Sequence, residues 1–171
     1  APGAHVVVAD DDSEDGTREV AAKFAGEMPI RVLHRRGVPR GLTASVVDAL
    51  ALVETPYFVV MDADLQHPPE AVAAMRAALA RADLVVGRRR DDEGLSASRR
   101  LISRGARSLT LTYLRNRKRP TTSDPMSGLF GGRTAFVRSI VHASGAQFER
   151  DGFKILVEIA VRAPRLRAAE V

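Results

Sequence analysis

Two groups of acidic residues follow short apolar runs in this 171-residue chain, and their types and spacing suit them to chemistry. Asp62 and Asp64 come directly after the run 57–61, and three aspartates, residues 10–12, come directly after the run 5–9. Clustered carboxylates repel one another unless a cation or hydrogen-bond donors neutralise them. Mg²⁺ commonly takes one or two carboxylates together with substrate phosphates. Asp62 and Asp64 therefore predict a metal site that binds a diphosphate.

The same acidic residues could instead have purely structural roles, and the sequence leaves these alternatives to metal binding open. An acid pair after a strand can simply cap the next helix, whose first turn favours negative charge. The aspartates at 10–12 can serve a turn, with Ser13 and Asp15 as caps of the helix that follows. Likewise, Ser127-Gly128 in a Gly-rich stretch can offer a hydroxyl and backbone N–H groups to a phosphate, or form a plain turn.

A basic segment at 99–119 provides the opposite charge. It holds eight basic and no acidic residues, whereas the other 150 residues hold 18 basic and 21 acidic ones. Periodicity predicts a basic amphipathic helix over 96–116, on which Arg100, Arg104 and Arg107 share one face. This face suits an anionic phosphate, and the apolar face suits a membrane surface. The alternative is a solvated helix face.

Strands and helices that alternate along the chain must position these residues. The predicted strands cover 5–9, 30–33, 57–61 and 84–86, and helices are expected after Thr17, over 42–53, after the proline pair at 68–69, and near 133–143 and 153–163. This order indicates a single three-layer α/β domain with a mostly parallel sheet. Residues 124–132 form a Gly-rich loop or short strand. In such sheets, ligands bind beyond the carboxyl ends of the strands.

Composition excludes several classes of protein and site. The chain has no cysteine, so it has neither a disulfide framework nor a thiolate zinc site. No uncharged apolar stretch is long enough to span a bilayer, and no leader-like start is present. We expect a cytoplasmic domain, and the basic helix favours peripheral contact with the cytoplasmic membrane face. A membrane-spanning extension outside this chain stays open as an alternative.

Four segments, in order, resemble motifs of the family 2 glycosyltransferases. Residues 8–17 resemble V-D-D-x-S-x-D-G-T, and residues 60–70 resemble M-D-A-D-L-Q-H-P-P-E. Residues 124–130 and 152–159 resemble D-P-M-S-G-F-F and G-F-K-I-L-x-E-I of the polyprenyl-phosphate branch. This branch includes dolichol-phosphate mannose synthases and bacterial polyprenyl-phosphate glycosyltransferases. Together the motifs span most of the chain.

The resemblance implies a nucleotide-diphosphate-sugar transferase (GT-A, Rossmann-like) fold and transfer of a sugar, mannose or glucose, to a polyprenyl phosphate with inversion. By position, Asp10 and Asp11 would contact the nucleoside, Asp62 and Asp64 would bind Mg²⁺ or Mn²⁺, and Gln66 would lie beside them. The acceptor phosphate would meet the basic helix and Ser127. Such a phosphate is already ionised near neutral pH and needs no strong general base.

The resemblance also predicts the organisation of the domain. The donor-binding half would cover about 1–94, and the acceptor helix and closing segment about 95–171. Family members carry a further strand and helix before the first motif, and a segment after the last one. We expect both to be missing here.

Two other functions are weighed against transfer of a sugar. Phosphatases that use D-x-D-x-T/V place the motif after their first strand, whereas here the fifth position is Gln66 and the strand is a later one. A non-catalytic module could bind lipid head groups or nucleic acid through residues 99–119. Only Tyr113 interleaves an aromatic ring there, and single-strand binders usually stack bases on such rings. No nucleic acid is therefore expected as a partner.

Overall fold

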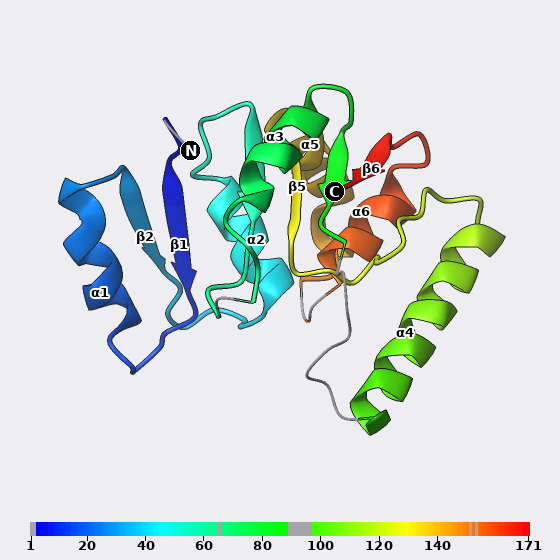
Figure 1. The fold of residues 1–171 in the computed structure, drawn as a ribbon, viewed down its shortest axis with the longest axis horizontal. Helices are drawn as coiled ribbons and strands as arrows, with labels where there is room; N and C mark the ends of the chain where they lie inside the picture. Colours follow the sequence, from blue (N-terminus) through cyan, green and yellow to red (C-terminus); the bar gives the residue numbers. More distant parts are fainter. Residues whose placement is uncertain (1–2, 65, 89–96, 151, 153) are drawn as a thin grey trace.

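The computed structural model describes residues 3–64, 66–88, 97–150, 152 and 154–171. The strands are β1 (Val6–Asp10), β2 (Ile30–His34), β3 (Tyr57–Val60), β4 (Leu84–Val86), β5 (Phe130–Arg133) and β6 (Ala168–Glu170). The helices are α1 (Thr17–Lys23), α2 (Leu42–Leu50), α3 (Ala71–Leu79), α4 (Ala97–Asn116), α5 (Thr134–Ser144) and α6 (Ile155–Arg162), with short 3₁₀ turns η1 (Phe24–Gly26) and η2 (Gly145–Gln147). Figure 1 shows their arrangement.

The strands form two hydrogen-bonded sheets. β1 and β2 pair in parallel from Val6 opposite Ile30 to Asp10 opposite His34. The second sheet has the order β3-β5-β4-β6. In it β5 runs antiparallel to both β3 and β4, and β6 runs parallel to β4. The sheet is therefore mixed: β3, β4 and β6 share one direction, as expected of a mostly parallel sheet, and β5 is reversed.

Two apolar clusters, one on each face of the larger sheet, confirm the three layers. Along β4, Leu84 and Val86 belong to the cluster that packs on α2, α5 and α6, whereas Val85 belongs to the cluster on α3. Successive side chains of a strand point to opposite faces, so a strand covered on both faces is apolar throughout. Phe130 of β5 contacts Phe58 of β3 edge-to-face, with ring centroids 6.3 Å apart.

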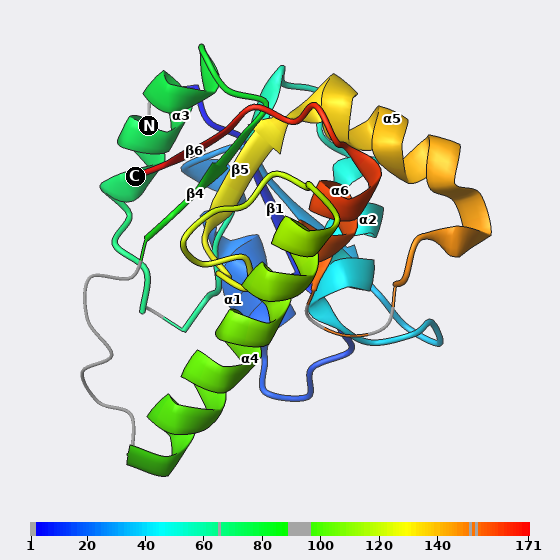
Figure 2. The same cartoon turned by 90° about the vertical axis from the view of Figure 1, so that its right-hand side faces the viewer.

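Helix α4 stands away from this body. Figures 1 and 2 show it as a long helix that projects to one side, with only its C-terminal end close to the core. Leu114, near that end, is fully buried, whereas Leu109 is 74% exposed. Helix α4 packs on α6. Within the described residues, no helix is long and apolar enough to cross a bilayer.

Most predicted elements form within a few residues of their expected bounds. The Gly-rich stretch divides into a loop, 124–129, and strand β5. Strand β6 was not predicted, because Ala168-Ala-Glu170 carries no β-branched or aromatic residue. Ser13 does not cap α1: the residue before α1 is Gly16, with φ of 82°, and Asp15 accepts a hydrogen bond from the Thr17 amide.

Candidate functional site

The Asp62 carboxylate lies against the Gly-rich loop that leads into β5. A Cβ built on Gly128 would lie 3.1 Å from Asp62 Cγ and inside the contact distance of its Oδ2. The two motifs meet because β3 and β5 are antiparallel neighbours, so β3 ends where β5 begins. Asp62 retains a 43% exposed side chain. One of its faces is fixed by main chain and the other is open.

The residues after Asp62 form a polar turn that supports it. The Gln66 amide donates to Asp64 Oδ1 at 3.0 Å, and both residues are exposed. His67 is mostly buried, and its Nε2 lies 3.3 Å from Asp62 Oδ2. A histidine in this position orients the carboxylate through a hydrogen bond. The turn therefore presents Asp62 and Asp64 at the exposed end of β3.

The chemistry of these donors fits a hard divalent cation. Asp62 and Asp64 offer carboxylate oxygens at an open surface, where phosphates can complete the coordination of Mg²⁺ or Mn²⁺. Among the residues that the structure describes, no group of three or more His, Asp or Glu gathers to hold an ion. Further ligands of an ion on these two residues would therefore be oxygens of water or of a bound phosphate. The diphosphate ligand stays a prediction.

The Asp10 carboxylate is buried and already bonded. Its Oδ2 accepts from the Ser13 amide at 3.2 Å and from Arg18 at 2.8 Å. Burial alone would raise the pKa of Asp10, but these hydrogen bonds outweigh it and hold the pKa below its ordinary value. Asp10 orders the loop after β1 rather than standing open to a ligand.

Asp11 is held by three donors from two other segments. Its Oδ1 accepts from Arg35 and from the Ser45 hydroxyl, and its Oδ2 accepts from the Gly41 amide. Burial would raise the pKa of Asp11, but bonds from Gly41, Ser45 and Arg35 together lower it. The side chain remains 28% exposed. Asp11 is therefore an oriented, ionised carboxylate with one open side.

Asp12 completes the acidic run in a more exposed position. It adopts a left-handed backbone with φ of 63°, which aspartate tolerates better than most residues. His34 Nε2 lies 2.6 Å from its Oδ1, and Arg18 and Arg40 lie within 4 Å. The hydrogen bond with His34 lowers the pKa of Asp12. Arg18 thus contacts both Asp10 and Asp12, whereas Asp11 is paired with Arg35.

The residues predicted to bind the acceptor phosphate differ in where the structure places them. Ser127 is buried, and its hydroxyl lies 3.0 Å from the Gly87 carbonyl and 3.2 Å from that of Leu129. This corrects the expectation of a phosphate contact, since the hydroxyl joins the end of β4 to the start of β5. Arg104 and Arg107 lie exposed on α4. Arg100 belongs to α4, but its side chain lies outside the described residues.

The buried end of α4 shows which way its arginine face points. Seven residues make about two helical turns, so Arg107 projects in nearly the direction of the buried Leu114. Between them, Thr110 Oγ1 lies 4.0 Å from Met126 Sδ in the loop before β5. Arg107 therefore extends on the side of α4 that faces the body. Leu109 and Tyr113 lie on a different side of the helix and are exposed.

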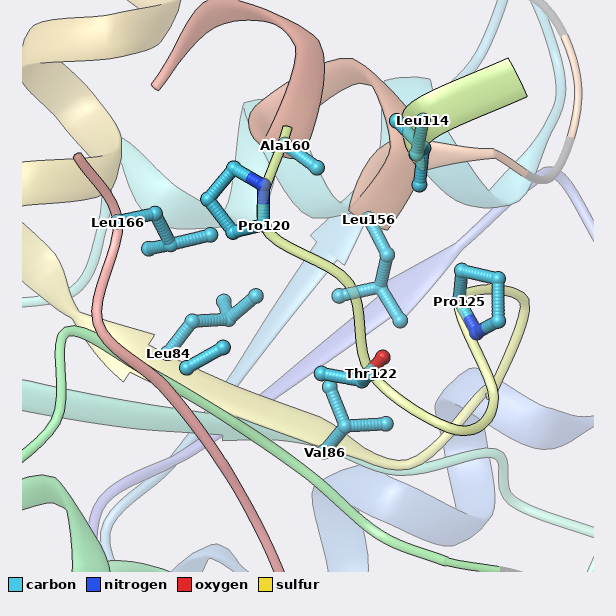
Figure 3. Close-up of a pocket in the computed structure, with 10 residues that line it drawn as sticks. Leu84, Val86, Leu114, Pro120, Thr122, Pro125, Leu156, Ala160 and Leu166 are labelled. Carbon is cyan, nitrogen blue, oxygen red and sulfur yellow. The ribbon is translucent and has the colours of Figure 1, made fainter. Parts of the chain in front are cut away.

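A small apolar cavity lies apart from the predicted site residues, with Leu114 in its lining. It is enclosed by β4, α6 and the segment after α4, and Figure 3 shows Leu84, Leu156 and Pro120 pointing into it. None of the predicted site residues lines it. The open acidic surface, and not this cavity, is the candidate site.

Sequence reasoning missed three residues of the hydrogen-bonded group around Asp11. Arg35, Ser45 and Asp48 form one hydrogen-bonded group with it. Arg35 follows a strand and Ser45 and Asp48 lie in a helix, so no local spacing connects them to Asp11. One signal was available in the sequence. Arg35 directly follows an apolar strand and Asp48 lies within an apolar helix, and charged residues in such positions are usually paired when they are buried.

Comparison with known proteins places the chain among sugar transferases. Residues 2–141 match the family described as "Glycosyl transferase family 2". Over 97% of its length, the chain is 35% identical to a dolichol-phosphate mannosyltransferase of Pyrococcus furiosus, covering 46% of that protein. It is 32% identical to the dolichol-phosphate mannosyltransferase of Saccharomyces cerevisiae, with coverage of 97% and 61%. The chain spans about half the length of the curated relatives it matches.

The fold also matches solved structures. The glucosyl-3-phosphoglycerate synthase of Mycobacterium tuberculosis, solved with Mn²⁺, UDP-glucose and phosphoglyceric acid, superposes with a TM-score of 0.73. The match covers 96% of this chain and 57% of that one, at 22% identity. This likeness confirms a GT-A nucleotide-sugar transferase fold.

Proposed function

Because the chain belongs to glycosyltransferase family 2, we propose that it transfers a hexose from a nucleotide-diphosphate sugar to a polyprenyl phosphate. One observation carries the proposal: the Asp62 carboxylate lies against Gly128, so the two motifs form one site at the end of β3. The relatives named dolichol-phosphate mannosyltransferase favour mannose as the sugar and a lipid phosphate as the acceptor.

Asp62 and Asp64 would hold Mg²⁺ or Mn²⁺ on the donor diphosphate. When bound, the cation neutralises charge that develops on the leaving nucleotide diphosphate. The named structural neighbour was solved with Mn²⁺ and UDP-glucose, which supports a divalent cation without choosing between the two metals. Asp11, oriented and partly open, would contact the nucleoside, whereas the buried Asp10 would keep the same loop in place.

The acceptor phosphate would approach from the side of α4 that faces the body. Arg107, two turns from the buried Leu114, lies on the side of α4 on which Thr110 contacts Met126 of the loop before β5. Charge-assisted bonds from arginine position an ionised phosphate oxygen as the nucleophile. Displacement at the anomeric carbon from the side opposite the leaving group inverts its configuration. Catalysis would thus rest on positioning and leaving-group stabilisation, with no strong general base.

Leu109 and Tyr113 would place the same helix on a membrane surface. Both are exposed apolar or aromatic residues, and Arg117 stacks over the Tyr113 ring at 4.8 Å. A basic helix with one apolar side is typical of interfacial binding to anionic lipids. The domain would therefore work at the cytoplasmic membrane face, where its lipid acceptor lies.

A thermal-shift experiment on the full-length protein tests the donor site. Mn²⁺ together with GDP or UDP should raise the melting temperature, because a ligand that binds only the folded state stabilises it. Asp64→Asn should abolish the rise. Glu54→Gln, which removes the same charge from an exposed residue elsewhere, should retain it. Absence of any metal-dependent shift in the unsubstituted protein would contradict the proposed function.

A further inference from the structure

Arg35, at the end of β2, is a buried cation that no predicted motif contains. Its side chain is 1% exposed. Nε donates to Asp48 Oδ2 at 2.9 Å, one terminal nitrogen donates to Ser45 Oγ and Asp11, and the other donates to the Pro39 carbonyl at 2.7 Å. A buried guanidinium is tolerated only when its donors are satisfied and its charge is paired. Two carboxylates meet that need here.

The partners of Arg35 come from separate parts of the donor half. Asp11 belongs to the loop after β1, Asp48 to α2, and Pro39 to the loop between β2 and α2. The Arg35 amide also donates to the Asp10 carbonyl at 2.8 Å. Arg35 therefore joins the acidic loop both to α2 and to the loop before it, and the Ser45 hydroxyl adds a second bond from α2 to Asp11.

Contacts at Asp48 extend this group to a distant segment. Arg150 pairs with Asp48 Oδ1, while Arg35 occupies Asp48 Oδ2. The amide of Thr43, in the first turn of α2, donates to the Gly152 carbonyl at 3.1 Å. The orientation of Asp11 is thus linked through Arg35 and Asp48 to the segment that precedes α6.

We propose that Arg35 is a positioning residue for Asp11, which it turns so that the open side of the carboxylate meets the nucleoside of the donor. This inference rests on the proposed function. Arginine is required because its planar fork reaches Asp11, Ser45 and Asp48 at once, whereas the single ammonium of lysine cannot match those directions. Lysine at this position keeps the charge but loses the oriented bond to Asp11, which is then held only by Gly41 and Ser45.

Calorimetric titration of nucleotide diphosphate with Mn²⁺ into the full-length protein tests the inference. Arg35→Lys should weaken binding by about tenfold, as expected for loss of oriented hydrogen bonds in a coupled group. Arg138→Lys is the matched control. Arg138 donates to the Leu50 and Val53 carbonyls at the other end of α2 and touches no acidic loop. The Arg138→Lys variant should bind nucleotide as tightly as the unsubstituted protein does.

A double-substitution cycle separates positioning from general stability. In an Asp11→Asn background, Arg35→Lys should weaken nucleotide binding no further, although it still lowers the melting temperature. Equal weakening in both backgrounds, or unchanged binding in Arg35→Lys, would overturn the inference. If Arg35→Lys fails to fold, Asp48→Asn takes its place with an expected loss of about threefold, and unchanged binding again overturns it. Failure of the unsubstituted protein to bind nucleotide would instead refute the proposed function.

Discussion

Replacing Gly128 by alanine should remove function while leaving the fold almost unchanged. The new Cβ would lie 3.1 Å from Asp62 Cγ, whereas carbon atoms pack best at about 3.5–4.0 Å. The Asp62 side chain is 43% exposed and open on the side away from Gly128, so it can rotate toward water. The carboxylate must therefore leave its observed position.

Two opposing contributions set the expected change in the free energy of unfolding. Forcing Asp62 off its rotamer costs about 0.5–1.5 kcal/mol. Alanine in place of glycine stabilises by about 0.4–1 kcal/mol where the backbone allows it, and Gly128 does not have a positive φ. The unfolding free energy should thus change by less than about 1 kcal/mol. Misplacing a site group by about 1 Å can reduce turnover on the order of 10²-fold.

Two other glycines provide controls for this experiment. A Cβ on Gly131 would lie 2.7 Å from the Phe58 carbonyl oxygen, which belongs to the neighbouring strand and cannot rotate away. Gly131→Ala should therefore destabilise the fold. Gly105, in α4, has nothing within 4 Å, so Gly105→Ala should stabilise the helix and leave donor binding alone. The assays are sugar transfer and Mn²⁺–nucleotide binding. Normal values for both in Gly128→Ala would refute the reasoning.

Two further predictions concern acid stability and the membrane. Hydrogen bonds from Arg167 lower the pKa of Asp83 in the folded protein. Between this pKa and the ordinary pKa of the unfolded chain, the unfolded state binds more protons than the folded state. The free energy of unfolding should therefore fall as the pH drops below about 4. Urea titrations should show this fall, and Asp83→Asn should flatten it; an identical slope in the variant would contradict the assignment. Leu109→Asp should weaken binding to anionic vesicles severalfold at constant fold stability, whereas Val20→Asp, an exposed position on α1, should not. Equal binding by both would argue against α4 as the membrane contact, and steeply salt-dependent binding to oligonucleotides would favour the nucleic-acid alternative.

The sequence predicted the carboxylates of the candidate site and the strand that ends at them. The apolar run 57–61 becomes β3, and Asp62 follows it directly, because strand propensity and acidic termination are local properties. The α4 helix likewise follows from its own periodicity, and the observed bounds, 97–116, differ from the predicted ones by one residue.

Tertiary structure decided how these pieces act together. The reversed direction of β5 brings Gly128 to Asp62, and no local pattern in 124–132 specifies which strands it joins. Ser127 is turned inward to the Gly87 carbonyl, 40 residues away in sequence. Arg35 meets Asp11 and Asp48 because a buried charge must find opposite charge wherever packing provides it. Residue types are local, but the pairing of charges and strands is a property of the folded chain.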